Sequence, residues 1–335
     1  MSDIARELGI STVSVSKALN GKDGVSDSLR KTIVKKANEL GYRCVDYSKG
    51  SEKDHHNIGI IISEHFLTKD MFYSRLYEKT MMKMSDKKQI GLLEIIKKDA
   101  EKALKPPVLM EAGQIDGLIV LGQMSKEYLR LLRRFDLPIL YMDFYDEDVF
   151  EDAVISDSVF GSGILTNYLI HRGHKRVAFV GSIHRTSSIM DRYIGYYRAM
   201  LAAGLAVEDG WLIEDRNADG DRIPPVLPGN MPTAFVCNSD ATAFELVKQL
   251  QAAGFQVPED ISVVGFDNFI YAEMSTPQIT TYGVDMDDLV LRAITIMLKK
   301  LDNKSYTAGR VLITGSMIER DSVRMIEEAD RQPAE

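Results

Sequence analysis

The feature that most limits how this chain can fold is a repeated alternation between short apolar runs and helical stretches, which begins at residue 57. Residues 58–62 are apolar except for one glycine, and similar runs follow at 91–96, 115–121 and 138–142. Helices are expected between them, over 71–84, from Asp99, and over 126–135. Continuous apolar runs of this length are typical of strands buried on both faces of a parallel sheet, so this region is predicted to form one α/β unit.

The same alternation restarts after residue 156. Strands are expected at 176–181, 211–214, 234–237 and 261–265, with helices over 161–171, 191–203 and 241–253. Two such cycles predict an α/β fold with two doubly wound parallel-sheet subdomains, roughly 58–156 and 157–280. Both belong to one domain of residues 58–330, whose C-terminal segment is expected to cross between the subdomains.

Residues 1–44 follow a different pattern, with three short helices and no strand. Gly9 is placed to end the first helix, Ser11 to cap the second, over 12–20, and Ser26 to open the third. Three short helices separated by a glycine turn predict a helix-turn-helix unit, whose second helix enters the major groove of DNA. Its small hydroxyl side chains suit hydrogen bonds to phosphates and base edges.

Charge is distributed unevenly along the chain. The whole chain has a net charge of −8, but residues 1–43 carry eight basic side chains against five acidic ones. A basic N-terminal unit on an acidic body indicates that only the N-terminal unit meets a polyanion. The alternative is a small helical bundle with no role in DNA binding.

Several sequence motifs of this N-terminal unit resemble those of a known family. Asp3-Ile4-Ala5, residues 9–21 (GISTVSVSKALNG), 25–26 and 39–42 closely resemble the DNA-binding head of the LacI/GalR family of bacterial repressors. The resemblance implies a DNA-binding domain over 1–44. It also implies that Thr12, Val13 and Lys17 read bases, with a second group close to the DNA backbone: Ser11, Ser14, Ser16 and Asn20.

The segment 45–57 is expected to be a linker that departs from the family pattern. Family members carry a Pro-Asn pair and then Ala-Arg-x-Leu, and their leucine wedges into the minor groove. Here the Pro-Asn pair is absent, Ser48-Lys49 stand for Ala-Arg, and Ser51 stands at the leucine position. The sequence therefore predicts weaker DNA bending than is usual for the family.

Polar and aromatic residues follow the expected strands of the body. Ligands of such folds bind beyond the carboxyl ends of strands, and two lobes can close around a small molecule. Carboxylates, an arginine and stacking aromatics at one cleft suit a polyhydroxylated ligand. The residues singled out on this basis are Phe72, Tyr73, Asp143, Thr186, Ser188, Arg192 and Asp267. The alternatives are that the two carboxylates are caps, the arginine lies on a helix surface, and the aromatics belong to the core.

The body also resembles the LacI/GalR family. Residues 169–181, 192–196, 257–268 and 276–281 match its motifs, which implies a periplasmic-binding-protein-like fold and effector contacts at the residues just named. By this resemblance the chain is expected to be a ligand-responsive transcriptional regulator, a repressor that senses a sugar. Because no Lys or Arg cluster was found around the cleft, a neutral sugar is preferred. Two alternatives stay open: the ligand is either an inducer or a corepressor, and the protein forms either a dimer or a tetramer.

The remaining expectations concern classes of protein that the sequence disfavours. No spacing typical of a catalytic set, a nucleotide loop or a metal site occurs, so no cofactor, metal or enzymatic activity is expected. No signal peptide or transmembrane run is present, and Cys44 and Cys237 lie far apart, which fits the cytoplasm. Expected partners are double-stranded operator DNA, a small-molecule effector and a second copy in a homodimer. The opposing class is an enzyme with a DNA-binding head, such as a sugar kinase.

Overall fold

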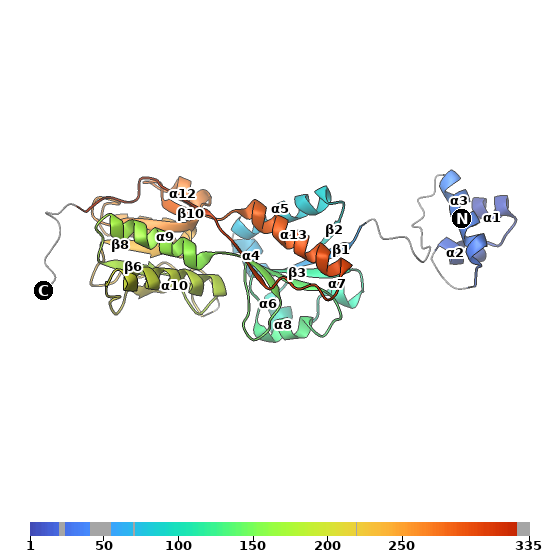
Figure 1. Ribbon diagram of the computed structural model, residues 1–335, viewed down its shortest axis with the longest axis horizontal. Helices are drawn as coiled ribbons and strands as arrows, with labels where there is room; N and C mark the ends of the chain where they lie inside the picture. Colours follow the sequence, from blue (N-terminus) through green and yellow to red (C-terminus); the bar gives the residue numbers. More distant parts are fainter. Residues whose placement is uncertain (20–23, 41–54, 70, 219, 327–335) are drawn as a thin grey trace. The chain divides into compact units, whose positions relative to one another are not determined.

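The computed structural model describes residues 1–19, 24–40, 55–69, 71–218 and 220–326. They form two compact units, one built before residue 56 and the other from His56 onward. The smaller unit holds three helices, and the larger unit holds two six-stranded sheets with their helices (Figure 1). None of the helices in these ranges is both long enough and apolar enough to cross a membrane.

The small unit has the helix-turn-helix arrangement that the sequence predicts. Its helices are α1 (Ser2–Leu8), α2 (Thr12–Leu19) and α3 (Asp27–Glu39). Gly9 ends α1 with a φ of 63°, a left-handed conformation that glycine adopts without strain. The Ser11 hydroxyl accepts a hydrogen bond from the backbone N–H of Ser14 at 3.0 Å and so caps α2. A shared apolar core of Ile4, Ala5, Val15, Ala18, Ile33 and Ala37 holds the helices together.

The larger unit consists of two lobes, each built around one sheet. In the first, the N lobe, the strand order is β11-β5-β4-β3-β1-β2 and every pairing is parallel. Its strands are β1 (Asn57–Ser63), β2 (Ile90–Ile96), β3 (Gly117–Leu121), β4 (Ile139–Met142), β5 (Asp152–Ser156) and β11 (Arg310–Ile313). Its helices are α4 (Glu64–Lys69), α5 (Met71–Asp86), α6 (Lys98–Lys102), α7 (Val108–Glu111), α8 (Lys126–Leu132) and α13 (Met286–Asp302). Helices α5 and α13 cover one face of the sheet, and α7 and α8 cover the other.

The second lobe, the C lobe, has the strand order β12-β10-β9-β8-β6-β7, with only β12 antiparallel to its neighbour. Its strands are β6 (Val177–Val180), β7 (Leu212–Ile213), β8 (Ala234–Cys237), β9 (Ser262–Asp267), β10 (Thr280–Gly283) and β12 (Ser316–Ile318). Its helices are α9 (Ser158–His171), α10 (Ser187–Ala202), α11 (Asp240–Ala252) and α12 (Ile270–Met274). Helices α9 and α10 pack on one face of the sheet and α11 and α12 on the other.

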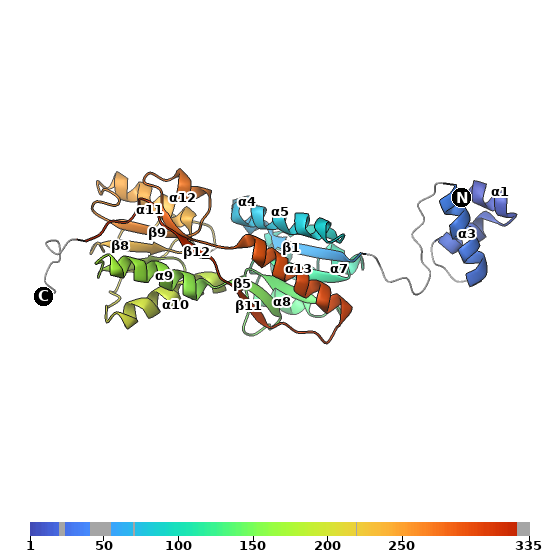
Figure 2. The same cartoon turned by 45° about the horizontal axis from the view of Figure 1, so that its top comes forward.

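The chain passes between the lobes three times, after β5, after β10 and after β11 (Figure 2). The last two crossings touch closely. A Cβ atom on Gly315 would lie 1.8 Å from the carbonyl oxygen of Gly283, so only glycine fits there. The Gly315 N–H donates to the Tyr282 hydroxyl at 2.7 Å. The lobes are therefore joined by neighbouring backbone segments that can act as one hinge.

One local expectation needs correction. The strand expected over 211–214 is only the two residues of β7, because Trp211 packs into the core with its indole N–H bonded to the Asn230 carbonyl at 2.8 Å. A short helix that was not predicted, α4, directly follows β1.

Candidate functional site

The predicted DNA-reading residues lie on the outer side of α2. Thr12, Val13 and Lys17 are exposed, with Val13 62% exposed, while Val15 and Ala18 on the opposite side are buried. An exposed valine among hydroxyl and amino groups is unfavourable in water but suits contact with a thymine methyl. The Arg30 guanidinium of α3 donates to the Ala18 carbonyl at 2.9 Å and so fixes the end of α2 against α3.

The residues predicted to lie near the DNA backbone are placed differently from one another. Ser11 and Ser14 bond each other at 2.9 Å at the start of α2, and Ser16 is half-buried on it. Asn20 and the altered linker positions Ser48, Lys49 and Ser51 lie outside the described residues.

The predicted effector residues converge on one cavity between the two lobes. Phe72, Tyr73 and Asp143 come from the N lobe, and the rest come from the C lobe: Thr186, Ser188, Arg192 and Asp267. As expected for such folds, they lie at the carboxyl ends of parallel strands or at the helix starts that follow. The cavity is only about 40 Å³. A small-molecule site is usually about 300 Å³ or larger, so a ligand enters only when the lobes move apart.

Arg192 and Asp267 form the central ion pair of the cavity. An Arg192 N–H donates to Asp267 Oδ1 at 3.0 Å, and another donates to the Asn238 carbonyl. The guanidinium also lies 4.0 Å from the centre of the Phe266 ring. The side chains are only 8% and 12% exposed, so the idea that Arg192 lies on a helix surface is wrong.

A second carboxylate faces this pair from the N lobe. The Tyr73 hydroxyl donates to Asp143 Oδ2 at 2.8 Å, which holds this carboxylate at the cavity. Phe72 and Tyr73 belong to the apolar core of the N lobe, which confirms the core interpretation, and they also line the cavity wall.

The backbone at both carboxylates is unusual. Asp143 has a φ of 67° and Asp267 a φ of 103°, in the region that residues other than glycine rarely adopt. Neither residue is a helix N-cap, since the helices that follow them, α9 and α12, have Asp157 and Phe269 as their N-caps. Strained backbone that aims a polar side chain into a cavity is typical of functional sites.

Hydrogen bonds also join the two lobes outside the residues that line the cavity. The backbone N–H of Ser187 donates to the Gln123 amide oxygen at 2.7 Å, and the Tyr145 hydroxyl donates to Asp191 Oδ1 at 2.9 Å. Burial raises the pKa of Tyr145 to about 12, so it remains a donor at neutral pH. These bonds must break or adjust when the cleft opens.

Sequence reasoning missed part of the cavity wall. Arg216 and Arg222 line it beside Arg192, so the expectation that no basic cluster surrounds the cleft is wrong. Both lie in the irregular stretch between β7 and β8, which shows no hydrophobic period. The short hairpin in which Arg216 and Arg222 pair places both of them at the cavity. The other lining residues are Asn238, Ser239, Phe66 and Ile189.

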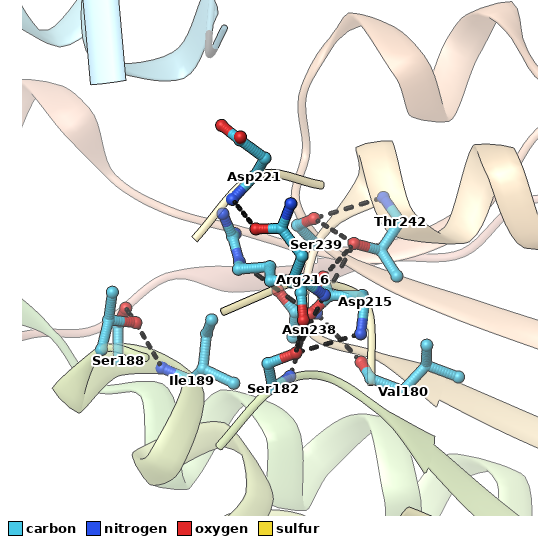
Figure 3. A network of polar contacts seen from close by, with 12 residues as sticks. Val180, Ser182, Ser188, Ile189, Asp215, Arg216, Asp221, Asn238, Ser239 and Thr242 are labelled. Atoms are coloured by element: carbon cyan, nitrogen blue, oxygen red, sulfur yellow. Dashed lines mark hydrogen bonds and ion pairs between the residues drawn. The ribbon is translucent and has the colours of Figure 1, made fainter. Parts of the chain in front are cut away.

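A buried polar network supports this wall from behind (Figure 3). The Asp215 carboxylate, 1% exposed, accepts hydrogen bonds from the Ser182 N–H at 2.9 Å, the Asn238 amide at 2.7 Å and the Thr242 hydroxyl at 2.8 Å. Burial alone would raise the pKa of Asp215. The nearby Arg216 charge and these hydrogen bonds outweigh burial and hold the pKa below its usual value. Asp215 is therefore an ionised anchor that fixes Asn238 at the cavity.

No group of three or more His, Cys, Asp or Glu side chains is placed to hold a metal ion within the described ranges. The cavity instead combines guanidinium, carboxylate, hydroxyl and aromatic groups, which can bind and orient a polar ligand.

Comparisons with known proteins agree with both units. Residues 1–44 match the family described as bacterial regulatory proteins, lacI family, and residues 166–323 match the periplasmic binding protein-like domain. The HTH-type transcriptional repressor PurR of Vibrio campbellii is 27% identical over 334 residues, which cover 97% of this chain and 98% of that protein.

Two solved structures share the fold over nearly the whole chain. The transcriptional regulator CelR in complex with cellobiose has a TM-score of 0.69 at 22% identity, covering 95% of this chain and 98% of its own. The lac repressor dimer bound to operator and the anti-inducer ONPF has a TM-score of 0.69 at 18% identity. The match covers 96% of this chain and 98% of the lac repressor chain. These proteins are transcription regulators rather than enzymes. The chain thus carries a DNA-binding domain of the lacI family and a periplasmic binding protein-like domain, and it is a ligand-responsive DNA-binding repressor.

Proposed function

We propose that the chain senses a sugar in the cavity between its lobes and transmits its presence to operator DNA. The observation that carries this proposal is the convergence of two carboxylates, a guanidinium and aromatic rings from both lobes on one cavity. Asp and Arg side chains bind pairs of sugar hydroxyls, while an aromatic ring packs on the apolar face of the sugar. The related fold of CelR holds cellobiose, which supports a sugar as the ligand.

The effector contacts proposed are Phe72, Tyr73, Asp143, Thr186, Ser188, Arg192 and Asp267. Since they come from both lobes, a ligand that binds them favours one separation of the lobes over others. A neighbouring cavity of about 550 Å³ shares the lining residue Phe66 with the site. We propose that the cleft binds its ligand without catalysing a reaction of it. The protein is proposed to act in the cytoplasm, where operator DNA is found.

DNA recognition is proposed to rest on α2, with Thr12, Val13 and Lys17 at base edges and Ser11, Ser14, Ser16 and Asn20 near phosphates. A homodimer would place two such helices on the two halves of a pseudo-palindromic operator. The lac repressor, which shares this fold, binds its operator as a dimer. Exposed Met71 of α5 and Ile270 of α12 supply apolar surface that a second copy could cover.

The proposal is tested by combining a ligand screen with a DNA shift assay. Sugars and nucleosides are first screened for a rise in melting temperature, since a ligand that binds only the folded state stabilises it. The selected sugar is expected to change operator affinity of the wild type, whereas Arg192→Ala and Asp267→Ala bind the operator but do not respond. A normal response in either variant would place the effector elsewhere, and turnover of the sugar would favour the enzyme class.

A further inference from the structure

Asn238 brings to the cavity a polar group that was not among the predicted effector residues. It directly follows β8, lines the cavity and is only 1% exposed. Its amide nitrogen donates hydrogen bonds to Asp215 Oδ2 at 2.7 Å and to the Val180 carbonyl oxygen at 3.0 Å (Figure 3). Asp215 and Val180 lie behind the wall and do not line the cavity themselves.

The orientation of this amide is fixed by its two acceptors. A carbonyl oxygen such as that of Val180 can only accept. Although burial opposes the ionisation of Asp215, the Arg216 charge and the hydrogen bonds hold its pKa below the usual value, so its carboxylate can only accept as well. A Cβ atom on Gly181 would lie 2.9 Å from Asn238 Cβ and 3.0 Å from its Nδ2, so the side chain has little room to move. The amide nitrogen therefore faces Asp215, and the amide oxygen is left for another partner.

Two polar atoms of the cavity-lining residues have no hydrogen-bond partner within the described part of the chain. One is Asn238 Oδ1, an acceptor, and the other is the Nε–H of Arg192, a donor. The other two nitrogens of Arg192 are used, since they donate to the Asn238 carbonyl and to Asp267 Oδ1. The two unpartnered atoms thus belong to residues that contact each other. A buried polar atom without a partner is costly, so each of them favours a ligand that supplies one.

A ligand that fills the cavity has to satisfy both atoms. At about 40 Å³ the cavity has room for water but not for a sugar, so a sugar that opens the lobes displaces any water held there. Asn238 Oδ1 then needs a donor, and Arg192 Nε–H needs an acceptor. A hydroxyl group can do both, whereas the ionised oxygens of a carboxylate or a phosphate only accept. This part of the wall therefore suits a hydroxyl group rather than an anion.

We propose that Asn238 is a specificity-determining residue of the effector site, whose amide oxygen accepts a hydrogen bond from a hydroxyl group of the effector. Arg192 Nε–H donates to an oxygen on the same edge of the effector. The inference rests on the proposed sugar-sensing function and deepens it, because it requires a neutral, hydroxyl-bearing edge of the sugar at this wall of the C lobe. Loss of that hydroxyl strands a buried acceptor, a mismatch that binding sites reject strongly.

Deoxy sugars test the inference on the full-length protein. Calorimetric affinity is measured for D-glucose, D-galactose and D-ribose, and for the derivatives of each that lack one hydroxyl group. For a sugar that binds, removal of the hydroxyl that meets Asn238 is expected to weaken binding by about tenfold or more. In Asn238→Ala, removal of the same hydroxyl should weaken binding by no more than about twofold, because the acceptor is gone. The penalties for the other hydroxyls should stay as they are in the wild type.

Thr242→Val is the matched control. The Thr242 hydroxyl donates to the same Asp215 carboxylate at 2.8 Å, but Thr242 does not line the cavity. Both variants thus remove a buried hydrogen bond to Asp215, and only Asn238→Ala removes the amide oxygen. The control should keep the full penalty for the deoxy sugar. If Asn238→Ala does not fold, Asn238→Ser takes its place, because a serine hydroxyl can still donate to Asp215 but supplies no amide oxygen.

One result would overturn the inference and leave the proposed function intact. It is a sugar that changes operator affinity while its deoxy derivatives show the same penalties in Asn238→Ala as in Thr242→Val. If no sugar of the three series raises the melting temperature or changes operator affinity, the sugar-sensing proposal fails and the inference fails with it.

Discussion

The ion pair between Arg192 and Asp267 makes a quantitative prediction for the stability of the C lobe. Both side chains are nearly buried, and Arg192 also bonds the Asn238 carbonyl and packs on Phe266. Arg192→Met leaves a carboxylate buried without its cation and should cost about 3–5 kcal/mol of unfolding free energy. Asn also tolerates a positive φ, so Asp267→Asn removes only the negative charge of the group that accepts the Arg192 hydrogen bond. The expected loss of unfolding free energy is about 1.5–3 kcal/mol.

The double variant distinguishes a true pair from two independent sites. With Asn at 267, the loss of the arginine no longer strands a charge, so the double variant should cost no more than Arg192→Met alone. The size of the coupling energy is therefore expected to be at least the cost of Asp267→Asn, about 1.5–3 kcal/mol. Unfolding in urea is followed by the fluorescence of Trp211, which is the chain's one tryptophan and is buried in the same lobe.

An exposed pair in that lobe provides the control. Lys248 and Glu245 of α11 lie 3.3 Å apart with side chains 57% and 49% exposed, and their removal should cost less than about 0.5 kcal/mol. If the penalties at Arg192 and Asp267 add within about 0.5 kcal/mol, the two side chains do not interact and the account of the cavity is wrong.

Three further predictions follow from other parts of the molecule. Lys17→Ala should weaken binding to a selected operator and reduce the slope of log K against log salt by about one, as measured by anisotropy, and an unchanged slope would mean that Lys17 meets no phosphate. Gly195→Ala should destabilise by about 3 kcal/mol because its Cβ would lie 2.2 Å from the Val159 carbonyl, whereas Gly163→Ala, with 3.6 Å of room, should not destabilise in the same urea assay. Burial lowers the pKa of His174 to about 4. Between pH 6.5 and 4, His174 is therefore protonated in the unfolded state but remains neutral in the folded state. Stability should then fall by up to about 1.4 kcal/mol per pH unit between pH 6.5 and 4, and less steeply in His174→Gln.

The parts of the fold that could be predicted are those in which local pattern and tertiary role agree. The central residues of strands such as β1 and β3 are apolar because both faces of these strands are covered. The Gly9 turn and the Ser11 cap are set by neighbouring residues. Helix α13 also carries a clear periodic signal, with Leu289, Val290, Ala293, Ile294 and Met297 buried, but it was not among the predicted elements.

The parts that were missed depend on contacts between distant segments. Strands β11 and β12 are short, and their pairing with β5 and β10 requires the chain to return to both lobes after α13. Arg216 and Arg222 become neighbours only through a hairpin closed by backbone hydrogen bonds. The predicted residue Asp267, by contrast, lies at the end of a strand, and Arg192 lies in the second turn of α10. Their meeting follows from the general rule that parallel α/β folds gather polar groups there.

The claim on which the whole account depends is that occupancy of the cleft and binding of DNA influence each other. The most direct measurement is the affinity of the full-length protein for its operator with and without a saturating cleft ligand, together with the affinity for that ligand with and without operator. Thermodynamic linkage requires both affinities to change by the same factor, which should lie in the range of about 5–150. That factor should fall to one in Arg192→Ala. Equal operator affinity in the presence and absence of a ligand shown to bind the cleft would contradict the account.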